Sequence, residues 1–179
     1  RGPAAAAAAA PVSPLVSRVV AALAKWSSNA SVFVLGYPTP EKKMRNARKK
    51  LEVLNTEQVI GLIDATAFGS AKEAILFTST GLRFRTGDYS KPKLEPTFVS
   101  WQDYRTLDFC AGSFGSFQVK VGGFYAISIP RSDLSNSTIV EMLQAVQQAV
   151  SVAQGCIVAQ EAQAAAMHTA AAAAVPVAQ

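Results

Sequence analysis

The side chains that most often carry catalysis or bind metals are few in this chain and lie far apart. Its 179 residues include one histidine, His168, and two cysteines, Cys110 and Cys156. A serine or cysteine nucleophile needs an adjacent base, and a transition metal needs clustered imidazole or thiolate ligands. His168 lies in an alanine-rich tail, and the carboxylates show no paired spacing. We therefore expect no catalytic site, no metal site and no cofactor, and we expect both cysteines to be buried as small apolar residues.

Two glycine-containing stretches were candidates for phosphate binding. In GSAKEA, residues 69–74, the lysine precedes a glutamate and a predicted strand. A phosphate-binding loop instead needs a second glycine and then Lys-Ser or Lys-Thr at the start of a helix. GSFGSF, residues 112–117, lies between two predicted strands and fails the dinucleotide-binding pattern. We therefore predict neither nucleotide hydrolysis nor a small-molecule substrate.

Lysine and arginine are the side chains whose pattern does indicate a site. The formal net charge is +5, and six cations fall within the nine residues 42–50. They are Lys42, Lys43, Arg45, Arg48, Lys49 and Lys50. The alternating strand LRFRT adds Arg83 and Arg85 on one of its faces. Because such side chains attract phosphate and carboxylate groups, these eight residues are the candidate anion-binding or lipid-binding set.

The basic cluster leaves the kind of anionic partner open. An anionic membrane surface would attract it electrostatically. Nucleic acid is disfavoured, because no aromatic residue lies between Glu41 and Leu54 to stack on bases. Weak, nonspecific contact with nucleic-acid phosphates remains as a second alternative.

Hydrophobic periodicity predicts the elements that position these residues. Leu15, Val19, Leu23 and Trp26 recur at helical spacing after Pro14, which predicts an amphipathic helix packed against protein. The basic residues fall on a second predicted helix over residues 40–54, capped by the threonine before Pro40.

A period of two over residues 55–130 predicts about six or seven antiparallel strands. One hairpin turns at Thr80-Gly81, and a later strand, TFVSW, ends at Trp101. A long amphipathic helix then begins at Ser135 or Asn136. Its apolar residues recur at near-heptad spacing and form a candidate face for a partner helix: Ile139, Leu143, Val146, Val150 and Ile157.

These elements predict an α+β fold in which N-terminal helices precede an antiparallel β-sandwich or open barrel, and the long C-terminal helix caps it. Locally, AILFTSTGLRF (residues 74–84), the preceding EQVIGLIDATAFGSAKE and the later FVSWQDY are similar to segments of small bacterial domains. The chain in this way resembles bacterial pleckstrin-homology-like (PH-like) and GRAM-like modules over residues 37–150.

The predicted organisation has four parts: a low-complexity tail over residues 1–12, a helix and linker over 13–36, the PH-like domain over 37–155, and an alanine-rich extension over 156–179. No apolar run approaches the ~20 residues that span a bilayer. We expect a non-catalytic, cytoplasmic interaction module that acts in protein recruitment or self-assembly. Peripheral binding to anionic membrane lipids is the alternative.

Overall fold

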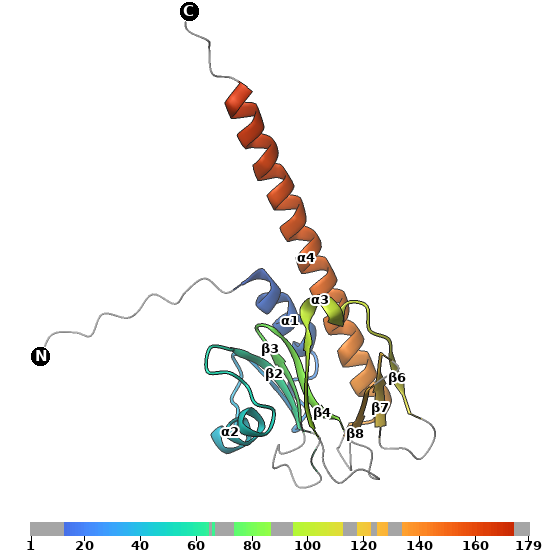
Figure 1. Ribbon diagram of the computed structural model, residues 1–179. Helices are drawn as coiled ribbons and strands as arrows, with labels where there is room; N and C mark the ends of the chain where they lie inside the picture. The colour runs from blue at the N-terminus through green and yellow to red at the C-terminus, as the bar shows by residue number, and fades with distance from the viewer. Residues whose placement is uncertain are drawn as a thin grey trace, which may run out of the picture.

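A computed structural model describes residues 13–64, 66, 74–86, 95–112, 118–122, 125–128 and 134–173 (Figure 1). The alanine-rich N-terminal tail, the FGSAK segment and the last six residues therefore lie outside the described residues. The elements follow in chain order: α1 (Pro14–Ala24), β1 (Val32–Val34), α2 (Glu41–Lys50), β2 (Val59–Asp64), β3 (Ala74–Thr78), β4 (Gly81–Thr86), β5 (Glu95–Ser100), α3 (Trp101–Tyr104), β6 (Phe109–Ala111), β7 (Gln118–Val121), β8 (Tyr125–Ser128) and α4 (Asn136–Ala173).

The strands pair in the antiparallel order β1-β2-β3-β4-β8-β7-β6, and β5 pairs with β4 along its whole length. Strand β8 meets β4 only where Thr86 pairs with Ile127. Strands β1 to β5 thus form the main sheet, and β6 to β8 form a smaller one joined to it at a single bridge. Among the described residues these pairings do not close into a barrel. The structure therefore shows the expected α+β class with an antiparallel sheet and a C-terminal helix.

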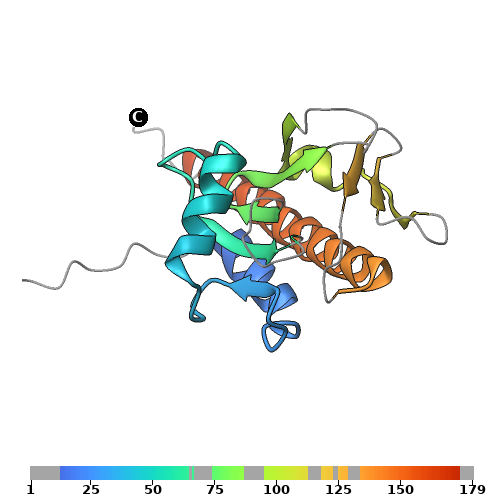
Figure 2. The same ribbon diagram turned by 90° about the horizontal axis from the view of Figure 1, so that it is seen from below.

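One face of the main sheet is apolar and packs against α1 and α4 (Figures 1 and 2). Because side chains alternate along a strand, Ile75 and Phe77 of β3 point to this face, as do Leu82 and Phe84 of β4. Val19 and Leu23 of α1 are fully buried against it. Gly61 lets α1 approach β2 closely, because a Cβ there would lie 2.5 Å from Cδ1 of Leu23 and this buried side chain would have to move. Close contact between α1 and β2 follows from that missing side chain.

Helix α1 belongs to the same core as the sheet and α4, so the predicted division at residue 37 does not separate two packing units. The prediction that this helix packs on protein is confirmed by Val16, Val19 and Leu23, which are buried. Its N-cap residue, Ser13, makes no side-chain capping bond, and the Ser13 carbonyl instead accepts from the Ser17 amide.

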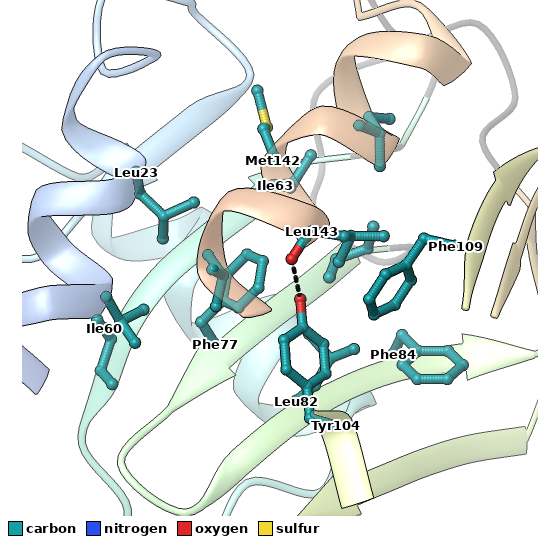
Figure 3. Packing of buried hydrophobic residues seen from close by; sticks show 14 of the residues in the cluster. Leu23, Ile60, Ile63, Phe77, Leu82, Phe84, Tyr104, Phe109, Met142 and Leu143 are labelled. Carbon is teal, nitrogen blue, oxygen red and sulfur yellow. Dashed lines mark hydrogen bonds between the residues drawn. The ribbon is translucent and has the colours of Figure 1, made fainter. Parts of the chain in front are cut away.

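The short helix α3, which follows β5 in the chain, is hydrogen-bonded to α4. The Tyr104 hydroxyl donates a 2.7 Å hydrogen bond to the Leu143 carbonyl within the core (Figure 3). Full burial raises the pKa of Tyr104 well above its ordinary value, because ionisation there would place a charge in an apolar interior. Gln147 Nε2 donates to the carbonyls of Tyr104, Arg105 and Leu107 and so satisfies the end of α3. These bonds fix α4 against the sheet.

Three local predictions were wrong. Trp101 does not end a strand: it begins α3, because the Ser100 hydroxyl accepts from the Asp103 amide as a helix cap. Thr39 does not cap α2, since its hydroxyl donates to the Tyr37 carbonyl. Both Cys110 and Cys156 are exposed rather than buried. Cys156 follows the buried part of α4, and its sulfur accepts a 3.8 Å hydrogen bond from Nη2 of Arg18.

Candidate interaction surface on helix α2

Helix α2 covers the second face of the main sheet, opposite α1 and α4 (Figure 2). Ala47 and Leu51 are buried there against Leu62 of β2 and Leu76 of β3, with Met44 packed beside them. This apolar contact is narrow, because a ten-residue helix with six cations offers few apolar positions. Ion pairs and hydrogen bonds supply the rest of the attachment.

Lys43 is one of the cations that attach α2 to the sheet. Its Nζ lies 3.0 Å from Oδ2 of Asp64, whose side chain is 1% exposed. It also lies 4.9 Å from the centre of the Phe33 ring. The Asp64 Oδ1 atom accepts from the amide and hydroxyl of Thr66, as expected for an aspartate at a turn. Lys43 is therefore neutralised inside the fold and is a poor candidate for an external anion.

Arg83 is neutralised in the same way. Its Nε and Nη2 donate to the two carboxylate oxygens of Glu57 at 2.8 and 2.6 Å, and its Nη1 donates to the Leu51 carbonyl at 3.4 Å. The guanidinium also stacks 4.6 Å from the centre of the Phe98 ring. The hydrogen bonds from Arg83 hold the pKa of Glu57 below its ordinary value, although burial opposes this. Arg83, like Lys43, is therefore a poor candidate for binding an external anion.

Arg85, on the same strand β4, also has an interaction partner within the chain.

Arg48 forms hydrogen bonds but no ion pair with a described residue. Its guanidinium donates to the carbonyls of Leu54 at 2.9 Å and Glu57 at 3.2 Å. Carbonyl oxygens carry no net charge, so the positive charge of Arg48 remains available while its position is fixed.

Four exposed cations form the solvent side of α2, and we call them the outward cationic face. They are Lys42, Arg45, Lys49 and Lys50. None of them has an ion pair or hydrogen bond with another described residue. Lys42, Arg45 and Lys49 follow at spacings of three and four residues, so they project from neighbouring positions on one side of the helix. This part of the predicted anion-binding set is therefore placed together on one surface.

An open groove runs beside this face and has a volume of about 560 Å³. It is lined by Thr39, Glu41, Met44, Arg45, Arg48, Lys49, Val53 and Asn55. The lining thus includes three cations and one carboxylate, all from α2, together with the apolar side chains of Met44 and Val53. A smaller apolar pocket of about 90 Å³ adjoins it, because Thr39 and Met44 line both depressions.

The candidate partner-helix face is not available in this fold. Ile139, Leu143, Val146 and Val150 are all fully buried in the core between α4, α1 and the sheet. The side chain of Ile157 lies outside the described residues. The heptad-like spacing therefore reflects packing of α4 on its own domain. Ala153 is the last residue of α4 that is buried among those whose burial is described, and the helix continues away from the sheet to Ala173 (Figure 1).

Neither the groove nor the apolar pocket was among the sites predicted from the sequence. The available signal was the pair Tyr37 and Leu54, exposed residues on either side of α2 in the sequence, because large apolar residues beside a basic cluster suggest a binding surface. Within the described ranges, no three histidine, cysteine, aspartate or glutamate side chains come close enough to hold a metal ion. None of the described helices combines the length and apolar character that crossing a bilayer requires.

These features define a class of protein in structural terms: an α+β domain with a helix-borne basic surface. The comparisons of this chain with protein-family models, curated proteins and solved structures found no match.

Proposed function

We propose that the protein is a non-catalytic interaction domain that binds an acidic segment of a partner protein through the outward cationic face and the groove beside it. The observation that carries the proposal is the division of the basic cluster. Lys43 is neutralised by Asp64 to attach the helix, whereas Lys42, Arg45, Lys49 and Lys50 form no ion pair within the part of the chain that the structure describes. A helix attached on one side presents its remaining charges in a fixed arrangement, which favours binding of an anionic ligand.

A concave surface favours a protein segment over a flat partner. The groove is lined by both cations and apolar side chains, which suits a chain with both acidic and apolar residues. The PH-like layout that the sequence resembles stays part of this proposal, because a sheet covered by helices presents such surfaces on a rigid base. Self-assembly through the stripe of α4 is no longer part of it, since the core buries that stripe.

An anionic membrane surface is the second candidate. Tyr37 and Leu54 are 49% and 60% exposed at the two ends of α2. Exposed apolar residues beside lysine and arginine suit the boundary of a membrane that carries anionic lipid. Both candidates need the outward cationic face, so the test has to compare the two ligands directly.

The test measures binding of a fluorescein-labelled poly-glutamate peptide by anisotropy, and binding of phosphatidylserine vesicles by co-sedimentation. We expect the peptide to bind at low salt and to bind more weakly at about 0.15 M ionic strength, where charges are screened. Lys42→Glu/Arg45→Glu/Lys49→Glu should abolish binding. The matched control, Lys25→Glu/Arg105→Glu/Lys120→Glu, makes the same change of charge at exposed residues outside α2 and should retain most of it.

Two results would overturn the proposal. Equal loss in both triple variants would mean that net charge, not the face on α2, determines binding. Binding to phosphatidylserine vesicles without binding to the peptide would replace the proposal with the membrane candidate.

A further inference from the structure

A small apolar pocket lies next to the groove at the start of α2. Its walls come from β1, β2 and the loop between β1 and α2, and include Val34, Leu35, Tyr37, Met44 and Val59. The pocket holds about 90 Å³. This is far below the roughly 300–1,000 Å³ of sites for drug-sized ligands. Its size and lining suit one short aliphatic side chain.

The loop that forms this pocket has a defined shape. The Tyr37 amide donates a 3.0 Å hydrogen bond to the Val34 carbonyl, which closes a tight turn. Gly36 stands third in that turn with φ of +89°, a conformation that glycine adopts without strain. Apart from its two chain neighbours, no described residue has an atom within 4 Å of the position a Cβ would occupy on Gly36, so the space beside this residue is open. The turn holds Tyr37 as a half-exposed wall.

The pocket and the groove meet at Thr39 and Met44, which line both. A bound chain that passes along the groove would therefore reach the pocket without leaving the surface. The groove supplies positive charge from Arg45, Arg48 and Lys49 against the single carboxylate of Glu41. Charge complementarity thus favours acidic residues in the groove, and burial of apolar area favours an aliphatic residue in the pocket.

We infer that the partner segment is acidic and carries one aliphatic anchor residue, which enters the pocket between Tyr37 and Met44. This inference rests on the proposed function, because the acidic residues have to bind the outward cationic face and the groove. It adds a specificity rule that charge alone does not contain: two segments of equal charge differ in affinity according to the anchor.

Two fluorescein-labelled peptides test the inference: one of glutamates with a central leucine, and one of the same length with a central serine. Their charges are equal, so binding through charge alone gives equal affinities. Burial of one aliphatic side chain predicts that the leucine peptide binds about tenfold more tightly. Tyr37→Ser should reduce that ratio towards one, because it removes a wall of the pocket.

Leu54→Ser is the matched control, because Leu54 is likewise exposed but lines neither depression. It should keep the tenfold ratio. Equal affinities for the two peptides in the wild-type chain would overturn the inference while leaving the proposed function intact. A preference for leucine that survives Tyr37→Ser would also overturn it, because the anchor would then bind elsewhere. Binding of neither peptide would instead refute the proposed function, and the inference with it.

Discussion

The two faces of the main sheet are both covered by helices, but by different means. On the first face, α1 and α4 cover a continuous apolar layer that includes Phe77 and Phe84. On the second face, α2 covers a small apolar cluster, and Lys43 and Arg83 form ion pairs beside it. The first face contributes most of the apolar burial and hence of the stability. The second face gives α2 a fixed position while leaving its outer side charged.

This difference divides the cations of α2 into two groups: those that interact within the fold and those that form its outer side. A helix with six cations in ten residues cannot be held by apolar contact alone, so the fold neutralises Lys43 and bonds Arg48 to carbonyl oxygens. The four cations of the outward cationic face form no ion pair with a described residue. The residues that attach the helix thus differ from those for which we propose a binding role.

The largest expected effect comes from the apolar face. Phe77→Ala should lower the free energy of unfolding by about 3–5 kcal/mol, because it removes a fully buried ring and leaves a cavity. Urea denaturation followed by circular dichroism measures the change. Val152→Ala, an exposed position on α4, is the control and should stay within about 0.5 kcal/mol of the wild type. A loss below about 1 kcal/mol for Phe77→Ala would mean that the apolar layer does not dominate stability.

On the second face, breaking one ion pair should cost less. Arg83→Met should lower the free energy of unfolding by about 2–3 kcal/mol, because it leaves the carboxylate of Glu57, which is 5% exposed, without its bidentate partner. The double variant Glu57→Gln/Arg83→Met should recover part of that loss in the same urea experiment. No recovery would show that Arg83 acts through its contact with Phe98 rather than through the ion pair.

The same pair predicts how stability depends on pH. The pKa of Glu57 is lowered in the folded state, chiefly by hydrogen bonds from Arg83, relative to an ordinary value of 4.5. The stabilisation is therefore complete above pH 4.5 and is lost as the pH falls through the folded-state pKa. Urea midpoints of the wild type should decline more steeply below pH 4.5 than those of Arg83→Met. Equal slopes would show that Glu57 gains no charge-dependent stabilisation from Arg83.

Sequence periodicity predicted the helices and strands better than it predicted which residues contact one another. The alternation in LRFRT placed Arg83 opposite Leu82 and Phe84, which is correct, but the opposite face is not solvent. The carboxylate partner of Arg83 is Glu57, which lies 26 residues earlier in the chain, in a segment without a regular pattern. Pairing over such a separation depends on the tertiary fold, which local spacing does not encode.

The stripe on α4 shows the same limit. The spacing of Leu143 and Val150 identified an apolar face, but it could not distinguish a partner helix from the sheet of the same chain. The start of α3 at Trp101 was easier to predict from the sequence, because Ser100 and Asp103 have the three-residue spacing of a helix N-cap and its N3 residue. Of the candidate site, the basic helix was predictable. The neutralised cations and the two depressions were not, because they depend on where Asp64, Glu57 and Tyr37 come to lie.

The smallest expected change in stability is at the outward cationic face, where the effect on binding is expected to be largest. Lys42→Glu/Lys49→Glu should alter the free energy of unfolding by no more than about 0.5 kcal/mol, because both side chains are exposed and have no internal partner among the described residues. Lys43→Glu should destabilise the protein clearly, because it places a second carboxylate beside buried Asp64. Urea denaturation compares the two, and anisotropy with the poly-glutamate peptide reports binding. Clear destabilisation by the double variant would mean that the outer cations also hold α2 in place, and the separation of structural from binding residues would fail.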